Sequence, residues 1–290
     1  MKDKVQVHKY STHFDFSPNA LSSAGTIEGA LIRHNGGYGC LQPWPSLGDE
    51  DLDYHLLSIL KNNPTEQALA CFKCCEIDGN ARMKGIDLFE NITIPECHFT
   101  TSLPTNHEIS DEFINELKAF THLKVKGIKD TVKVAHYLEL LPENLFFRID
   151  FNSSLSPEEC VQFVQHLSKP CRDRIDFIED PFPYDPNIWD RFTKETGINL
   201  ALDRGPQDAE NGFNIRIWKP TIFPYVTTNL PVCVTHNMDH ELGRRYATYQ
   251  SAIANHTVTV NGIGPFNDAK NGPGLGMCDL LENLLWDDLK

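Results

Sequence analysis

The chain has 290 residues, of which 40% are hydrophobic and 23% charged, and its formal net charge at pH 7 is −14. This composition is typical of a globular protein, and the acidic balance argues against a nucleic-acid partner, because contacts to phosphate need basic patches. No apolar run reaches the roughly 18 residues that a membrane-spanning helix needs, and the N-terminus lacks the apolar segment of a signal peptide. We therefore expect a cytoplasmic protein with no membrane partner and with its nine cysteines reduced, while its oligomeric state is left open.

The N-terminal third is predicted to mix strands with helices. The stretch GTIEGALIRHNGGYGCLQPWP indicates two short strands around a turn at residues 35–37. Two segments with helical periodicity follow, DEDLDYHLLSILKN and TEQALACFKCCEI. The sequence therefore predicts an α+β domain over residues 1–97, which the C-terminal segment 266–290 is expected to join.

Strands and helices then alternate along the chain. The segments HLKVKG, NLFFRIDFN, RIDFIEDP, INLALD, IRIWKP and VCVTHN indicate strands, and amphipathic helices such as SPEECVQFVQHLSK separate the first of them. This rhythm favours parallel βα units, and six strands in one order favour a (β/α) barrel over residues 98–265 more than an open sheet. Only 15 residues separate Asp203 from Lys219, and GPQDAENGFN among them is too polar and Gly-rich for a full helix, so the barrel is expected to be trimmed on that side.

A charged residue stands at the end of each of the first five of these strands. In a (β/α) barrel the C-terminal ends of the strands meet at one mouth, where active sites lie. Three carboxylates from successive strands would converge there, and they would repel one another without a cation. Oxygen ligands with no His or Cys among them suit Mg²⁺, and Mn²⁺ could replace it. The predicted metal ligands are Asp150, Glu179 and Asp203, although each acid could instead cap the following helix.

Lysines flank the three carboxylates in the sequence. Lys124 and Lys126 alternate with apolar residues in HLKVKG, so both point to the same face of that strand. A lysine beside another cation has its ammonium form disfavoured, so its pKa falls and it can act as a base. Lys219 ends the strand IRIWKP. A solvated edge strand for the pair and a surface position for Lys219 are the structural alternatives.

Four further polar residues are candidates for contacts around the metal or substrate. Arg148 and Asn152 share the inward face of the FRIDFN strand, where they could orient the ligand carboxylate or a substrate. His236 and Asn237 follow the VCV strand and are expected to line the mouth. A zinc site of His236 with His240 is not favoured, because no third ligand is obvious.

Together these residues resemble the muconate-lactonizing-enzyme subgroup of the enolase superfamily. That subgroup carries KxK on the second barrel strand, then Asp, Glu and Asp on the next three, and a lysine on the sixth. Within the subgroup the sequence is most similar to the o-succinylbenzoate synthases: RIDFN matches their RxDxN strand, and RDRIDFIEDP and FTKETGINLALD match the approaches to the second and third ligands. GYGCLQPWPSLGDE resembles the G-x-G-E-x-x-P-x-P stretch of the capping domain. The resemblance covers roughly residues 27–243.

The resemblance implies a fold, a cofactor and a reaction. It implies a (β/α) barrel of enolase-superfamily type with an N-terminal α+β capping domain, Mg²⁺, and a small-molecule carboxylate as substrate. The family reaction is the dehydration of 2-succinyl-6-hydroxy-2,4-cyclohexadiene-1-carboxylate to 2-succinylbenzoate through an enediolate, a step of menaquinone biosynthesis. By resemblance, Lys126 is the base, Lys124 lowers its pKa, and Lys219 stabilises the enediolate from the opposite side.

The sequence also departs from the family pattern. Cys40 stands where Glu is usual, Arg204 follows Asp203 where an acid is usual, and THNMDHELG replaces a Ser-rich stretch. An N-succinylamino-acid racemase or a dipeptide epimerase of the same superfamily is an alternative, since Lys126 and Lys219 would supply a base on each face. A degenerate barrel that binds a ligand without turnover is a third reading, against which the intact lysines and carboxylates argue.

Overall fold

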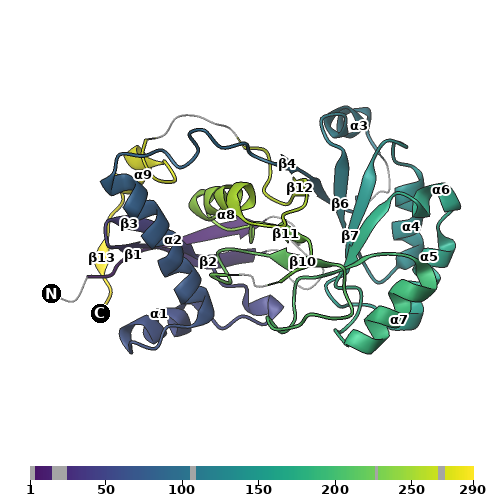
Figure 1. The fold of residues 1–290 in the computed structure, drawn as a ribbon, viewed down its shortest axis with the longest axis horizontal. Coiled ribbons are helices and arrows are strands. Elements are labelled where there is room, and N and C mark those ends of the chain that lie inside the picture. Colours follow the sequence, from purple (N-terminus) through teal and green to yellow (C-terminus); the bar gives the residue numbers. More distant parts are fainter. Residues whose placement is uncertain (1–3, 15–24, 105–108, 226–227, 267–271) are drawn as a thin grey trace.

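The computed structural model describes residues 4–14, 25–104, 109–225, 228–266 and 272–290. Figure 1 shows an antiparallel sheet with two helices on one side of the molecule and a barrel of parallel strands on the other. Both chain termini lie at the antiparallel sheet. None of the described helices is long and apolar enough to cross a membrane.

The N-terminal sheet has four antiparallel strands, and it contains the predicted hairpin. In spatial order the strands are β13 (Asp287–Asp288), β1 (Gln6–Phe14), β2 (Gly25–His34) and β3 (Gly37–Leu41). The turn between β2 and β3 places Asn35 at φ 51° and Gly36 at φ 77°, the left-handed pair that a tight two-residue hairpin turn requires. The pairing of β13 with β1 attaches the C-terminal segment to this sheet.

Two helices pack on the N-terminal sheet, α1 (Leu52–Leu60) and α2 (Glu66–Met83), and a short 3₁₀ helix, η1 (Pro45–Leu47), precedes them. The second helix lies very close to β3. A Cβ atom on Gly39 would lie only 2.4 Å from the carbonyl oxygen of Cys71, so only glycine permits this approach. The cysteines at positions 71, 74 and 75 of α2 are buried, and they belong to two hydrophobic clusters that this helix contacts. They therefore contribute to packing as small apolar side chains.

The barrel is built from parallel strands that neighbour one another in chain order from β5 to β11. Its strands are β4 (Glu96–Cys97), β5 (Phe99–Ser102), β6 (His122–Lys126), β7 (Phe146–Asp150), β8 (Ile175–Glu179), β9 (Leu200–Leu202), β10 (Ile215–Trp218), β11 (Val232–Val234) and β12 (Val260–Asn261). The strand β12 closes the ring: it pairs with β4, and the N–H of Gly262 donates to the carbonyl of Val234 at 2.8 Å. The predicted (β/α) barrel is confirmed.

Helices cover the barrel unevenly. The described helices of this part are α3 (Asp111–Leu117), α4 (Thr131–Glu139), α5 (Pro157–His166), α6 (Lys169–Arg172), α7 (Pro186–Thr196) and α8 (Glu241–Ile253), whereas α9 (Cys278–Glu282) lies beside the N-terminal sheet. The segment between β9 and β10 contains no helix, and neither do the described residues between β10 and β11, which confirms the predicted trimming. The helix α8 packs against both β11 and β3, so it connects the barrel to the N-terminal sheet (Figure 1).

The predicted division of the chain at residues 97 and 98 falls between β4 and β5. These two short strands together occupy one strand position of the barrel, because β4 pairs with β12 on one side and β5 pairs with β6 on the other. The N–H of His98, between them, donates to the carbonyl of Asn261 at 2.9 Å. The exact domain boundary therefore remains a prediction.

Candidate active site

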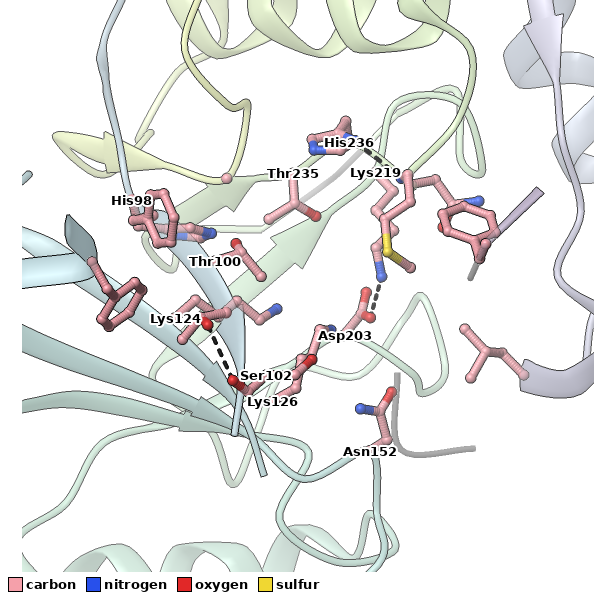
Figure 2. A pocket seen from close by; sticks show the side chains of 18 residues that line it. His98, Thr100, Ser102, Lys124, Lys126, Asn152, Asp203, Lys219, Thr235 and His236 are labelled. Carbon is pink, nitrogen blue, oxygen red and sulfur yellow. Dashed lines mark hydrogen bonds and ion pairs between the residues drawn. The ribbon is translucent and has the colours of Figure 1, made fainter. Parts of the chain in front are cut away.

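A cavity of about 610 Å³ lies at the C-terminal ends of the barrel strands, where the N-terminal part covers the mouth (Figure 2). Phe14, at the end of β1, and Leu47, in η1, form the part of the wall that the N-terminal part contributes. The barrel contributes charged side chains, and those that line the cavity directly are Lys124, Lys126, Asp203 and Lys219. Four of the six predicted strand-end residues thus face a common space, and the other two, Asp150 and Glu179, contact Lys124.

The two lysines of β6 point into the barrel, as the alternation predicts. Lys124 Nζ lies 2.6 Å from Glu179 Oε2 and 3.1 Å from Asp150 Oδ2, and Lys126 Nζ lies 2.6 Å from Asp150 Oδ2. The intervening Leu123 and Val125 are fully buried in the core between strands and helices. One face of β6 therefore serves packing and the other holds charge.

The electrostatics of this cluster are set by direct contacts between lysines and acids. Burial disfavours the ammonium of Lys124, but the carboxylates of Asp150 and Glu179 outweigh burial and raise the pKa of this lysine. Burial likewise opposes the charge on Asp150, and the two lysines of β6 nevertheless lower its pKa. Burial and the negative charge of Asp150 raise the pKa of Glu179 to about 7. Lys124 therefore stays charged, because Asp150 and Glu179 both contact its ammonium group directly.

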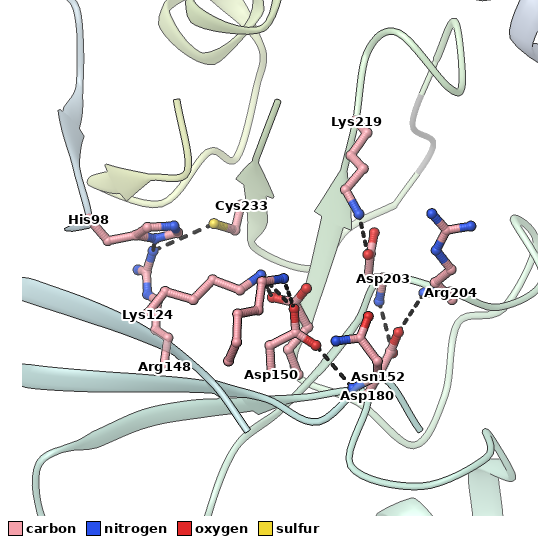
Figure 3. Close-up of polar contacts among 12 residues, drawn as sticks. His98, Lys124, Arg148, Asp150, Asn152, Asp180, Asp203, Arg204, Lys219 and Cys233 are labelled. Atoms are coloured by element: carbon pink, nitrogen blue, oxygen red, sulfur yellow. Dashed lines mark hydrogen bonds and ion pairs between the residues drawn. The ribbon is translucent and has the colours of Figure 1, made fainter. Parts of the chain in front are cut away.

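Lys219 forms a separate ion pair with Asp203. Burial alone would raise the pKa of Asp203, but the ammonium of Lys219 and the guanidinium of Arg204 lower it. The barrel has eight strand positions, since β4 and β5 share one of them. β10 lies four positions from β6, so Lys126 and Lys219 lie on opposite sides of the barrel. Figure 3 shows the two groups of side chains approaching the carboxylates from different strands.

A buried acid that the sequence analysis missed fixes the end of β9. The carboxylate of Asp180 accepts hydrogen bonds from the backbone N–H of Asp203 at 3.1 Å and of Arg204 at 2.9 Å (Figure 3). The Arg204 side chain points toward the N-terminal part and donates hydrogen bonds to Asp49 Oδ1 and to the carbonyl of Leu47, both at 3.0 Å. The arginine beside the third predicted ligand therefore pairs with the capping stretch.

The three acids end neighbouring strands or follow them directly, and they offer only hard oxygen donors. The oxygen Glu179 Oε1 is buried and has no hydrogen-bond partner, so one donor is already free. In the described part of the chain no three acidic, imidazole or thiol groups surround a common point, since lysine ammonium groups lie between the acids. The donor set fits a hard divalent cation such as Mg²⁺, which would compete with these ammonium groups for the carboxylates.

Arg148 and Asn152 act differently from one another. Arg148 was expected beside the ligand carboxylate, but its guanidinium crosses the barrel interior and donates to Asp176 at 2.7 Å and to the carbonyl of Val260 at 2.9 Å. Asn152 lines the cavity, and its backbone N–H donates to Asp150 Oδ1 at 3.1 Å. The asparagine therefore holds the first acid in place, whereas the arginine braces β7, β8 and β12.

His236 and Asn237 both line the cavity. The N–H of Met238 donates to His236 Nδ1 at 3.0 Å, and burial with the charge of Arg244 lowers the pKa of this imidazole to about 4. The carbonyl of Asn237 accepts a hydrogen bond from the Trp44 indole at 2.9 Å. Asn237 thus also joins the barrel to the capping stretch, which was not predicted.

Several cavity residues had no signal in the sequence analysis. The short strand β5 was not predicted, because the polar stretch FTTS shows little of a strand pattern, yet Thr100 and Ser102 of β5 line the cavity. Thr235 follows β11, and its hydroxyl is buried without a hydrogen-bond partner. Side chains of this kind become recognisable only when the barrel closes around them.

Comparisons with known proteins agree with this geometry. Residues 5–81 match the family model for the N-terminal domain of o-succinylbenzoate synthase. An o-succinylbenzoate synthase from Bdellovibrio bacteriovorus is 26% identical over 99% of this chain and 99% of its own length. Among solved structures, a muconate lactonizing enzyme from Mycobacterium smegmatis, complexed with muconolactone, has a TM-score of 0.76, 13% identity and coverage of 99% and 100%. A dipeptide epimerase from Cytophaga hutchinsonii, complexed with Mg and a dipeptide, has a TM-score of 0.71, 17% identity and full coverage of both chains.

The closed parallel barrel and the antiparallel N-terminal sheet define a fold that this chain shares with these solved structures. The family model that matches residues 5–81 and the relative that aligns over nearly the whole chain both carry the name o-succinylbenzoate synthase. The chain is thus similar in sequence to o-succinylbenzoate synthases, and it shares its fold with a muconate lactonizing enzyme and a dipeptide epimerase.

Proposed function

We propose that the chain is a lyase that dehydrates 2-succinyl-6-hydroxy-2,4-cyclohexadiene-1-carboxylate to 2-succinylbenzoate, a reaction of menaquinone biosynthesis. One observation carries the proposal: two lysines on opposite sides of one cavity are each paired with an acid that ends a barrel strand, Lys126 with Asp150 and Lys219 with Asp203. The relative that aligns over nearly the whole chain bears the name of this activity, which supports the same choice.

Lys126 is the proposed general base and, after proton transfer, the general acid. The C–H bond next to the substrate carboxylate breaks, and its proton moves to Lys126 Nζ. The C–O bond to the ring hydroxyl then breaks, and the hydroxyl takes that proton from the same ammonium and leaves as water. The electron pair from the C–H bond completes the aromatic ring, so aromatisation favours the forward direction.

The other charged residues of the site would stabilise negative charge on the substrate or bind the metal. Lys219 would stabilise the negative charge that develops on the substrate carboxylate as the proton leaves, and Lys124 would hold the carboxylates of Asp150 and Glu179 in place. Asp150, Glu179 and Asp203 are the proposed ligands of Mg²⁺, with Mn²⁺ as a substitute. When bound there, the cation would supply a Lewis acid for the substrate carboxylate.

The test is a spectrophotometric assay of 2-succinylbenzoate formation with Mg²⁺. We expect turnover by the unmodified protein and a loss of at least about 10²-fold in Lys126→Ala, because general acid–base catalysis contributes about 10² to 10⁴. Lys129→Ala, at an exposed position of the loop after β6, is the matched control and should keep full activity. An inactive unmodified protein, or an active Lys126→Ala, would remove the proposal.

Epimerisation of an N-succinylamino acid or a dipeptide is the second candidate. It is favoured by the placement of Lys126 and Lys219 on opposite sides of the cavity, since racemisation needs a base on each face of the substrate. Incubation with N-succinylamino acids or dipeptides in D₂O, followed by NMR, separates the candidates. Without exchange of the α-proton the epimerase reading fails, and metal-dependent turnover of any of these substrates excludes a barrel that only binds its ligand.

A further inference from the structure

His98 is a buried imidazole in the barrel wall that the reaction above does not use. It lies between β4 and β5, and only 5% of its surface is exposed. Its Nδ1 atom is 3.0 Å from Nη1 of Arg148. Because a guanidinium can only donate hydrogen bonds, Nδ1 must accept here, and the ring proton of the neutral imidazole must be on Nε2.

The position of Arg148 is fixed by several other contacts. Its Nε donates to Asp176 at 2.7 Å, its Nη1 donates to the carbonyl of Val260 at 2.9 Å, and its guanidinium lies 4.8 Å from the centre of the Phe177 ring. Only 2% of its surface is exposed. A side chain held at so many points cannot easily turn away, so it determines both the orientation and the tautomer of His98.

The Nε2 edge of His98 belongs to the wall of the active-site cavity. His98, Thr235 and Gly262 all line this cavity, and Figure 2 shows His98 and Thr235 on a side apart from Asp203. A Cβ atom on Gly262 would lie 3.0 Å from His98 Nε2, so the glycine keeps this edge open. No acceptor for Nε2 is found among the residues that the structure describes.

The charge state of His98 suits a donor that adds no charge to the site. Burial, followed by the positive charges of Arg148 and Lys124, lowers the pKa of this imidazole well below its ordinary value. The ring is therefore neutral at physiological pH, in contrast to Lys124, whose pKa is raised by the neighbouring acids. A neutral N–H can bind an acceptor oxygen without competing with the cationic groups for the reacting carboxylate.

We propose that His98 is a substrate-contacting residue whose Nε2–H donates a hydrogen bond to an acceptor oxygen remote from the reacting carboxylate, and that Arg148 is a positioning residue that acts through His98. This inference deepens the proposed function and rests on it for the substrate. The proposed substrate carries two such oxygens in its succinyl group, the ketone and the terminal carboxylate. Either could accept the bond, and substrate analogues distinguish them.

The tautomer can be tested without any catalytic assay. In ¹⁵N-labelled protein without substrate, the signals assigned by their loss in His98→Gln should show a proton on Nε2 and none on Nδ1, unchanged between about pH 6 and 9. Arg148→Lys should alter this pattern, since it removes the fork that donates to Nδ1. A proton on Nδ1, or an imidazolium at neutral pH, would overturn the inference whatever reaction the protein catalyses.

Kinetics test the contact with substrate. His98→Phe keeps an aromatic ring but removes the donor, and should raise KM about tenfold with a smaller change in kcat, as expected for one lost hydrogen bond. His98→Gln places an amide N–H near the position of Nε2 and should restore KM to within about threefold. Equal KM in the unmodified protein and His98→Phe would overturn the contact.

Binding of product analogues identifies the oxygen and covers the case in which the proposed reaction is absent. Calorimetry would compare 2-succinylbenzoate with analogues that lack either the ketone or the terminal carboxylate. The analogue whose affinity is the same for the unmodified protein and His98→Phe lacks the oxygen that His98 binds. If the unmodified protein binds 2-succinylbenzoate no better than His98→Phe does, the substrate contact is wrong even where the tautomer is as expected.

Discussion

Arg204 donates a hydrogen bond to Asp49 in the capping stretch, at 3.0 Å, whereas the neighbouring Asp203 pairs with Lys219. Its second acceptor is the carbonyl of Leu47, whose side chain lines the active-site cavity. The arginine thus spans from the end of a barrel strand to the loop that covers the mouth. The unusual residue beside the third proposed ligand is therefore accommodated without a salt bridge to that ligand.

Removing the ion pair between Arg204 and Asp49 should weaken the attachment of the loop that contains Leu47 to the mouth of the barrel. We expect Arg204→Gln to raise KM roughly threefold to tenfold with little change in kcat, because a partly buried ion pair is worth about 1 kcal/mol. The charge-reversed double variant Arg204→Asp with Asp49→Arg should recover part of the loss. Lys194→Gln, which removes an exposed pair with Asp190 on α7, is the control and should leave KM unchanged. No recovery in the double variant would argue against the pair as the cause.

A divalent cation should stabilise the folded protein if the three strand-end acids bind it. We expect Mg²⁺ to raise the melting temperature in a concentration-dependent way, because a ligand that binds only the folded state stabilises it. Glu179→Gln should abolish most of this shift, since it removes a ligand charge. Glu195→Gln, on the exposed face of α7, should retain the full shift. An equal Mg²⁺ shift in both variants would show that the cation binds elsewhere.

The sequence alone predicts the parts of this fold in which pattern and chemistry agree. The barrel strands from β6 to β11, their order and the trimmed segment after Asp203 follow from hydrophobic runs, charges at strand ends and loop length. The helix predicted in SPEECVQFVQHLSK forms as α5, which begins with a capping box at Ser156 and Glu159. These features depend on residues close together in the sequence, which is why they are readable.

Features that depend on distant residues were not predictable. The strand β5 is polar and short, and only its pairing with β6 identifies it as a barrel strand. The sequence places Arg148 on the inward face but does not show that its partners are Asp176 and Val260. A pattern of alternating residues gives the face of a strand, whereas the partner across the barrel depends on the closure of the ring.

Asp180 should matter for stability more than for chemistry. The residue is 2% exposed, and its carboxylate accepts hydrogen bonds from the backbone N–H groups of two residues that directly follow β9. Asp180→Ala would leave both N–H groups without an acceptor, at a cost of about 2 to 4 kcal/mol in the free energy of unfolding. Chemical denaturation measures this loss, and Asp190→Ala on the exposed face of α7 provides the baseline. A loss below about 1 kcal/mol would mean that water replaces the carboxylate.

Asp239 should make the stability of the protein depend on pH. Its Oδ2 accepts a hydrogen bond from Thr221 at 2.7 Å, while its Oδ1 is buried without a partner. Burial raises the pKa of Asp239 from 3.8 to about 6 in spite of the hydrogen bond from Thr221. Between these two values the folded protein holds a proton that the unfolded chain has released, so the contribution of this group to the free energy of unfolding falls as pH rises from about 4 to 6.

The variant Asp239→Asn isolates this contribution, since the amide oxygen can still accept the hydrogen bond from Thr221 but cannot ionise. We expect the free energy of unfolding of the unmodified protein, measured relative to Asp239→Asn by urea denaturation, to decrease across that pH range and to level off above it. Asp190→Asn, at an exposed position, should run parallel to the unmodified protein. A difference between the unmodified protein and Asp239→Asn that stays constant or increases with pH would mean that the buried carboxylate is ionised throughout and is balanced by a cation such as Lys219, which lies close enough to lower its pKa.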